Sequence, residues 1–265
     1  MFKIRGTLEK KTTWIIGGAS VGLVIVVWLI LTVGGLVPPS TIPGPGHIAE
    51  SVPEMHYEQY MVMQALVSLL RITLGFAAAA VIAVPLGILM GAYAPVRAAV
   101  QPLVGPLRFL PIAAALPIFI FWFGLGETTK IALLGVGTFV YLLPLIVETV
   151  QNVDDVYLKT AETLGATQGE VIWTILVPAA LPAIFEAMRV MYGIGWTYVM
   201  LAEFVSTADT GFGYGGIGYL INRLQRVGEL SDVLVCVALI LLLGVMVDKL
   251  LAWTRGVLLP WTERN

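Results

Sequence analysis

Long apolar segments alternate along this chain with short polar connections, and the first contains no charged side chain between Lys11 and Glu50. A helix needs roughly 20 residues to cross the hydrocarbon core of a bilayer. Segments of this kind recur, and six membrane spans are expected at residues 14–36, 61–93, 100–123, 131–150, 181–205 and 233–253. The first is too long for the apolar part of a cleaved signal peptide, which covers about 7–15 residues.

The composition also indicates a membrane protein. Hydrophobic residues make up 58% of the 265 residues and charged residues only 12%, whereas a soluble domain carries about 25% charged residues. A soluble protein with so few charges would expose large apolar patches. The net charge of −2 offers no basic surface for nucleic acid. The single cysteine, Cys236, lies in an apolar segment and is expected to be a small buried hydrophobe. The chain is therefore predicted to be an all-α membrane protein.

Positive charges predict the orientation of the spans, because cytoplasmic loops of membrane proteins are enriched in Lys and Arg. Lys3, Arg5, Lys10 and Lys11 precede the first span, whereas the loop at 37–60 carries Glu residues and no Lys or Arg. We therefore expect both termini in the cytoplasm and this loop outside. Three residues near the expected outer surface run against the charge rule: Lys130, Arg223 and Arg226.

A polar, helix-forming segment at residues 151–177 separates two apolar spans. It contains Lys-Thr-Ala-Glu-Thr-Leu-Gly-Ala at 159–166, which is too charged to lie in lipid and too short to form a domain. In the predicted topology it faces the cytoplasm. A structured polar segment in this position is typical of a docking site for another protein.

This segment resembles the EAA loop of bacterial ABC importer permeases, in which Glu-Ala-Ala is followed by three residues, Gly, nine residues and Ile-x-Leu-Pro. Four residues match the pattern: Ala161, Gly165, Ile175 and Pro178. Val177 replaces the Leu, and Lys159 and Thr160 stand at the first two positions. In that family the loop forms a short helix that inserts into a groove on a cytosolic ATPase.

Further similarity to the permeases of nitrate, sulfonate, taurine and bicarbonate importers covers about residues 60–255. It is carried by Arg108-x-x-Pro111, by the segments 121–126 and 213–226, and by Gly195-Trp196-Thr197-Tyr198-x5-Glu203. The resemblance implies the type I ABC importer permease fold, with six transmembrane helices and a cytosolic coupling helix. It divides the chain into an N-terminal part at 1–60, a permease core at 61–256 and a cytosolic tail at 257–265.

The resemblance also implies partners in the bacterial inner membrane. These are a second copy of the chain, cytosolic ABC ATPase subunits, and a periplasmic or lipid-anchored substrate-binding protein. ATP and Mg would be bound by the ATPase, so no cofactor is expected in this chain. The solute would be a small oxyanion or sulfonate, such as nitrate, bicarbonate, taurine or an alkanesulfonate. The residues expected to couple the chain to the ATPase are Lys159, Thr160, Ala161, Glu162, Gly165, Ala166, Ile175 and Pro178.

Charged residues inside apolar spans are candidates for the solute pathway, because they normally face a water-filled cavity or a partner. Together with nearby aromatic and polar groups, the candidates are Arg108, Arg189, Trp196, Thr197, Tyr198 and Glu203. Structural roles compete with this interpretation. Glu186 and Arg189 are three residues apart and can neutralise one another on one helical face. Arg108 follows Pro106 and precedes Pro111, and it could equally bind carbonyl groups freed by a kink. Arg71 is a further charge within a span.

Catalytic chemistry is not indicated, and the chain is expected not to be an enzyme. It lacks the G-x-x-x-x-G-K-[ST] phosphate loop. The segment 213–218 fits G-x-G-x-x-G, but no strand is predicted before it, so a flexible or re-entrant loop is expected there. His47 and His56 do not have metal-ligand spacing. The Gly87 and Gly91 pair is expected to let another helix pack closely.

Two other functions compete with the importer permease. An ion-coupled secondary transporter would carry internal repeats and unpaired carboxylates at mid-membrane, and only Glu186 and Glu203 come near that description. A membrane-embedded enzyme would need a metal cluster or an activated nucleophile. The importer permease is favoured because the polar segment, the topology and the number of spans agree.

Overall fold

The structure is a computed structural model that describes residues 8–204 and 212–262, and all regular structure in these ranges is helical. The longer helices are α1 (Lys10–Val33), α3 (Met61–Ala92), α6 (Glu127–Gln151), α9 (Val177–Phe204) and α11 (Leu230–Leu258). The shorter ones are α2 (Pro45–Tyr57), α4 (Ala94–Val104), α5 (Ile112–Phe123), α7 (Asp155–Thr163), α8 (Gln168–Glu170) and α10 (Ile217–Val227). Short 3₁₀ helices occupy Gly105–Phe109 and Pro260–Thr262, and a π-helical turn occupies Val171–Leu176.

The apolar segments form membrane-length helices as predicted. Within the described residues, five helices are long and apolar enough to cross a bilayer, and a bent pair makes a sixth crossing if its arms are counted together. The predicted span at 61–93 corresponds to α3 and the one at 131–150 to α6. The predicted end of the fifth span, Val205, lies outside the described residues. The expectation of an all-α membrane protein is confirmed.

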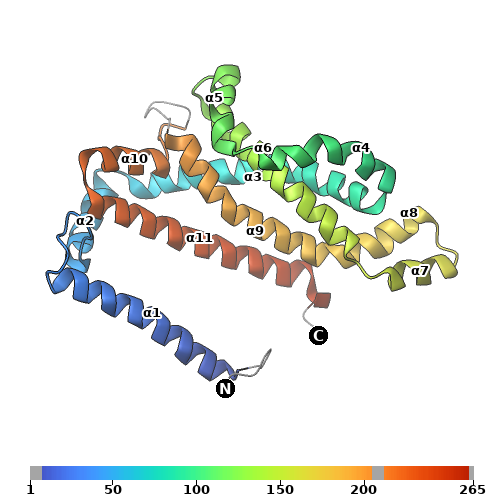
Figure 1. The fold of residues 1–265 in the computed structure, drawn as a ribbon, viewed down its shortest axis with the longest axis horizontal. Coiled ribbons are helices and arrows are strands. Elements are labelled where there is room, and N and C mark those ends of the chain that lie inside the picture. The colour runs from blue at the N-terminus through green and yellow to red at the C-terminus, as the bar shows by residue number, and fades with distance from the viewer. Residues whose placement is uncertain (1–7, 205–211, 263–265) are drawn as a thin grey trace.

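The third expected span, at 100–123, corresponds to a bent pair of helices instead of one continuous helix. Its two arms, Ala94–Phe109 and Ile112–Phe123, are bent by 103°. Proline explains the break, because it disfavours helical backbone at the residue before it and cannot donate a backbone hydrogen bond. Leu110, directly before Pro111, has extended backbone with φ −76° and ψ 117°. In Figure 1, α5 accordingly projects away from the long axis of the molecule.

Glycines on α3 let it pack against α6 at very short distance. A Cβ atom on Gly87 would lie 2.6 Å from the side chain of Ile146, and one on Gly91 would lie 2.5 Å from that of Val150. Small residues at a helix interface allow such close approach in membranes. The expected role of this glycine pair in close helix packing is confirmed.

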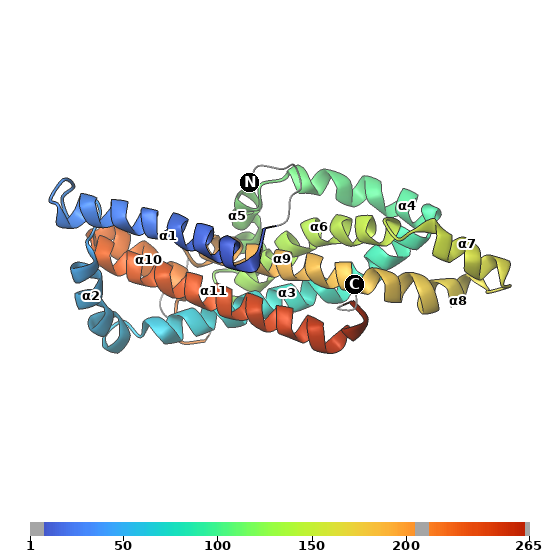
Figure 2. The ribbon, with the colours of Figure 1, turned by 90° about the horizontal axis from the view of Figure 1, so that it is seen from below.

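The elements leave two distinct ends (Figures 1 and 2). The end formed by α2 and α10 is called the α10 end below, and the end formed by α7 and α8 is called the α7 end. Helix α1 lies apart from the bundle in Figure 1 and has no buried residue. Its apolar side chains, such as Trp14 at 81% exposure, suit a helix surrounded by lipid.

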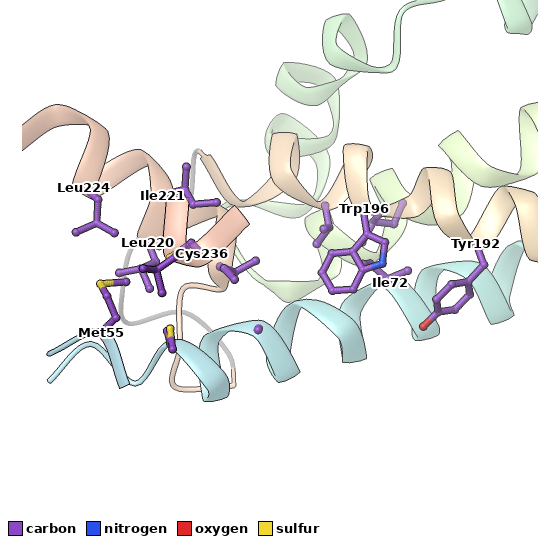
Figure 3. Packing of buried hydrophobic residues seen from close by; sticks show 14 residues of the cluster. Met55, Ile72, Tyr192, Trp196, Leu220, Ile221, Leu224 and Cys236 are labelled. Atoms are coloured by element: carbon purple, nitrogen blue, oxygen red, sulfur yellow. The ribbon is translucent and has the colours of Figure 1, made fainter. Parts of the chain in front are cut away.

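The α10 end has its own apolar core (Figure 3), in which α2, α3, α9, α10 and α11 meet. Met55 of α2, Leu220 of α10 and Cys236 of α11 are all almost completely buried there. Cys236 is thus the small buried hydrophobe expected from its position in the sequence. The apolar face of α10 packs on this core. This packing positions the first turn of α10, which takes part in the polar network described below.

Candidate functional site

Helix α7 is a short polar helix with a specific beginning and end. The Asp154 side chain accepts a hydrogen bond from the backbone N–H of Val156 at 2.9 Å, which caps the first turn. At the other end, Gly165 has φ 83° and donates to the Glu162 carbonyl at 3.0 Å, while Ala166 donates to the Ala161 carbonyl at 3.1 Å. These two bonds form a Schellman motif, for which glycine in the left-handed region is the usual residue. Gly165 therefore ends this helix.

The surface of α7 is open except on the side that faces the bundle. Ala161 is buried, whereas Val156, Tyr157 and Leu164 are 63%, 59% and 82% exposed. Apolar residues so exposed at the end of the molecule suit contact with another protein. A cavity of about 400 Å³ between α7 and the ends of α3 and α6 is lined in part by Glu162.

The polar side chains on the outer face of α7 are exposed to solvent. Lys159 forms an ion pair with Asp155, one turn earlier, at 3.7 Å, and both side chains are 75% exposed. Thr160 is also exposed, and its hydroxyl donates to the Val156 carbonyl at 2.7 Å. The polar side of α7 is therefore a solvated surface in this chain.

An irregular segment joins α7 to the long helix α9. Thr167 and Glu170 cap α8 reciprocally, and a π-helical turn follows at Val171–Leu176. Pro178, in the first turn of α9, cannot donate a hydrogen bond to the carbonyl four residues earlier, and a wider π turn accommodates this kind of defect. Ile175 lies in the π turn and Pro178 in the first turn of α9, and both are half-buried.

The candidate pathway residue Arg108 lines a cavity at the bend of the α4–α5 segment. The cavity measures about 650 Å³, and its lining includes Arg97, Gln101, Glu148 and Gln151. The Arg108 guanidinium lies 4.9 Å from the centre of the Phe109 ring. Its backbone carbonyl accepts a hydrogen bond from the Tyr141 hydroxyl at 3.1 Å. The side chain thus contributes positive charge to the cavity.

Arg189 lies in an exposed charge cluster between α9 and α11, nearer the α7 end. Its guanidinium donates to both carboxylate oxygens of Asp248 at 2.5 and 2.6 Å, and it also pairs with Glu186 at 3.3 Å. Glu186 in turn pairs with Arg255 at 3.0 Å. The expected neutralisation of Glu186 by Arg189 is confirmed, but the closer partner of Arg189 is Asp248. The sequence reasoning did not identify this pair because it joins two different spans.

The other candidates on α9 face in different directions. Trp196 is buried in the core of Figure 3, and the Tyr198 ring packs against Gly137 of α6. Thr197 is exposed, and its hydroxyl donates to the Ile194 carbonyl at 2.7 Å. The structure does not gather these residues around Arg108.

Glu203 is fully buried and belongs to a second charge cluster at the α10 end. Arg71, also fully buried, donates to its carboxylate at 2.7 Å. Arg71 also donates from Nε and Nη2 to the two carboxylate oxygens of Glu127, both at 2.6 Å, and Lys130 donates to Glu127 at 2.9 Å. These four residues, Arg71, Glu127, Lys130 and Glu203, are called the buried cluster below. Two positive and two negative charges balance within it.

Backbone groups of the segment 214–218 complete the hydrogen bonding of the buried cluster. Arg71 donates to the carbonyls of Tyr214 at 2.9 Å and Gly215 at 2.8 Å. Together with its carboxylate contacts, these bonds use all five N–H donors of a guanidinium. The N–H of Gly218 donates to Glu203 at 2.8 Å. Full satisfaction is what makes a buried charge tolerable in an apolar environment.

The sequence predicted a flexible or re-entrant loop at the glycines of 213–218. In the structure, one of these glycines, Gly216, lets the backbone approach the buried cluster closely. A Cβ atom on Gly216 would lie 2.2 Å from the Glu203 carboxylate, so the backbone approaches the charges only without a side chain. The sequence feature that could have predicted this site is the presence of two opposite charges, Arg71 and Glu203, in separate apolar spans. Lys130, which ran against the charge rule, lies next to the Glu127 carboxylate.

The sequence of the chain is similar to those of known transport proteins. Residues 83–255 match the family described as binding-protein-dependent transport system inner membrane component. The chain is 28% identical to the taurine transport system permease protein TauC of Escherichia coli (strain K12), covering 98% of this chain and 93% of that protein. It is 31% identical to the putative ABC transporter permease protein MJ0413 of Methanocaldococcus jannaschii, covering 77% and 74%. Permeases named for aliphatic sulfonates, nitrate and bicarbonate are also similar.

The fold is shared with solved importer structures. The inward facing MetNI methionine ABC transporter matches with a TM-score of 0.61 at 18% identity, covering 78% of this chain and 97% of that one. The chain therefore belongs to the family of binding-protein-dependent transport inner membrane components, as the permease component of an ABC importer.

Proposed function

We propose that two copies of this chain form the translocation pathway of an ATP-driven importer, and that α7 of each copy docks on a cytosolic ATPase subunit. The observation that carries this proposal is α7 itself, a separately capped helix with exposed apolar side chains at one end of the bundle. It lies within the part of the chain that matches the permease family.

The ATPase is a separate subunit in this proposal, because the chain has no phosphate-binding loop. ATP and Mg are bound by that subunit, and this chain carries no cofactor of its own. Closure of the ATPase pair pushes on α7. The π turn and Pro178 pass this movement to α9, and the pathway alternates between two states whose populations nucleotide binding shifts.

The α7 end faces the cytosol in this proposal, and both termini lie on that side. Lys10 and Lys11 precede the first span, as expected for a cytoplasmic N-terminus. The α10 end then faces the periplasm or cell exterior. A groove there of about 600 Å³ is lined by residues of α2, α10 and the start of α11, including Glu50, Glu54 and Arg223. This polar surface suits the external binding protein that delivers the solute.

The solute is a small oxyanion or sulfonate. Relatives are named for taurine, aliphatic sulfonates, nitrate and bicarbonate. The cavity that contains Arg97 and Arg108 measures about 650 Å³, within the range of about 300–1,000 Å³ for sites of small ligands. Arginine binds such anions well because its planar fork matches their oxygens.

Ion-coupled secondary transport is less well supported. Its candidate coupling carboxylates were Glu186 and Glu203, and both are occupied by arginine partners, at 3.0 and 2.7 Å. A coupling carboxylate must instead bind and release a proton or cation during transport.

Solute uptake by the reconstituted complex tests the proposal. The chain is co-expressed with an ABC ATPase and a substrate-binding protein from the same genome and is placed in proteoliposomes with labelled taurine, nitrate or bicarbonate. Uptake should require both ATP inside and the binding protein outside. Uptake by the chain alone, driven by a proton or sodium gradient, would contradict the proposal.

A further inference from the structure

The buried cluster lies where four parts of the chain meet. Arg71 comes from α3, Glu127 and Lys130 from the start of α6, and Glu203 from the end of α9. The fourth part is the segment 214–218, which supplies backbone carbonyl and N–H groups instead of charged side chains. The cluster therefore fixes the segment that precedes α10 to three membrane helices.

The first turn of α10 is bound directly to this cluster. The Ser68 hydroxyl lies 2.8 Å from the Glu203 carboxylate and accepts the N–H of Ile217, also at 2.8 Å. The N–H of Gly216 donates to the Gln64 side chain at 2.8 Å. Both Ser68 and Gln64 are on α3. The free N–H groups that begin a helix are thus held by side chains of α3 and α9.

The backbone conformation of the segment 214–218 requires a glycine at position 216. Gly216 has φ 98°, in the region that L side chains avoid. A Cβ atom there would lie 2.4 Å from the Arg71 guanidinium. Backbone and charges are therefore in contact without an intervening side chain, which gives α10 one defined starting position.

The rest of α10 presents opposite faces to the core and to the surface. Ile217, Leu220 and Leu224 are buried, whereas Arg223 and Arg226 are exposed. Arg223, Leu224 and Val227 line the groove at the α10 end together with residues of α2. Any rotation of α10 at its first turn would change this groove.

We propose that Arg71 and Glu203, together with Ser68, are positioning residues for transport: they hold α10 in the orientation that the external binding protein contacts. This inference rests on the proposed function. Because all donors of Arg71 are satisfied across four parts of the chain, these parts move as one body during transport. Contact of the binding protein with α10 is thereby transmitted to α3, α6 and α9 together.

Spin-label distances combined with ATPase assays test this inference. Labels are attached to cysteines at the exposed positions Gln225 of α10 and Glu58 beside α2, while the native Cys236 is fully buried and stays unlabelled. The variants are Arg71→Lys, which keeps the charge but loses the fork, and Ser68→Ala, which removes one contact to α10. Asp248→Asn, in the exposed cluster, is the matched control.

Both variants should broaden the distance distribution, and the control should leave it narrow. Stimulation of the ATPase by the loaded binding protein should fall by about fivefold or more, the lower range of allosteric coupling, while the basal ATPase rate of the complex stays unchanged. A purely structural role would instead lower the yield of the complex and both rates together.

Narrow distances in both variants would overturn the inference, and so would normal stimulation despite broadened distances. A wild-type complex that shows no stimulation by any binding protein would contradict the proposed function. The distance measurement would then still decide whether Arg71 and Ser68 position α10.

Discussion

Two charge clusters in the molecule have the same balance of charges but different surroundings. The buried cluster at the α10 end has two basic and two acidic residues, with side-chain exposures from 0% to 14%. Glu186, Arg189, Asp248 and Arg255 form an equally balanced exposed cluster nearer the α7 end, with exposures from 25% to 49%. Among the described residues, the buried cluster is the one of the two that is hydrogen-bonded to the backbone of a connecting segment.

This difference separates a fixed end from an adaptable one. A charge in an apolar environment is costly unless it is paired and hydrogen-bonded, so the buried cluster tolerates few arrangements. Exposed ion pairs can be exchanged for water at little cost. The α7 end, with its exposed cluster and its separately capped helix, is therefore the end at which movement requires the least free energy.

Removal of one carboxylate from each cluster tests most directly whether burial makes the two clusters different. Glu203→Gln should lower the free energy of unfolding by about 3–5 kcal/mol, because the buried Arg71 charge loses a partner. The matched change Asp248→Asn should lower it by only about 0–1 kcal/mol. Thermal unfolding of the purified variants in one detergent measures both. Equal losses in the two variants would show that burial does not distinguish the clusters.

The cap of α7 provides the next largest effect. Gly165→Val should lower solute uptake by about tenfold, because a left-handed backbone costs an L side chain roughly 1–2 kcal/mol and the last turn would open. Membrane insertion should be normal. The control is Gly169→Val, since Gly169 is exposed and has no neighbouring atom in the way. Normal uptake and normal ATPase stimulation in Gly165→Val would contradict docking through α7.

A smaller effect is expected from the cavity that contains Arg108. Arg108→Gln should lower uptake at limiting concentrations of an anionic solute by about fivefold to tenfold, since a hydrogen bond to a charged group is worth about 1.5–3 kcal/mol and only part of it is lost. Arg108→Lys should retain part of the uptake. Uptake at limiting and saturating solute separates binding from turnover. An equal loss at both concentrations, together with poor folding, would assign Arg108 a structural role.

The sequence predicted the helices better than it predicted their contacts. The positions of α3 and α6 follow from long apolar runs, because a bilayer demands a minimum helix length. The end of α7 follows from the backbone freedom of Gly165. The prolines around Arg108 indicated a kink, but its size of 103° was not predicted because hydropathy contains no information on helix direction. The pairing of Arg71 with Glu203, 132 residues apart, depends on how the spans assemble, which composition and periodicity do not contain.

Charge reversal on α7 should have the smallest effect, and it tests which side chains of the α7 end contact the ATPase. Lys159 stands where the family pattern has Glu, and its pair with Asp155 is 75% exposed on both sides. Such a pair is typically worth about 0–1 kcal/mol, so neither Lys159→Glu nor Glu162→Lys should change stability measurably. Effects on assembly with the ATPase would then report the docking surface alone.

The two reversals distinguish three kinds of contact. If a positive charge on this chain meets an acidic ATPase groove, Lys159→Glu should weaken assembly and Glu162→Lys should not. If the carboxylate docks, Glu162→Lys should be the harmful change, since Glu162 lines the cavity beside α7. We expect the second result, with about a twofold to fivefold loss of complex in pull-down assays, as exposed charge pairs allow. Wild-type assembly in both variants would assign docking to shape and to the exposed apolar residues Val156, Tyr157 and Leu164.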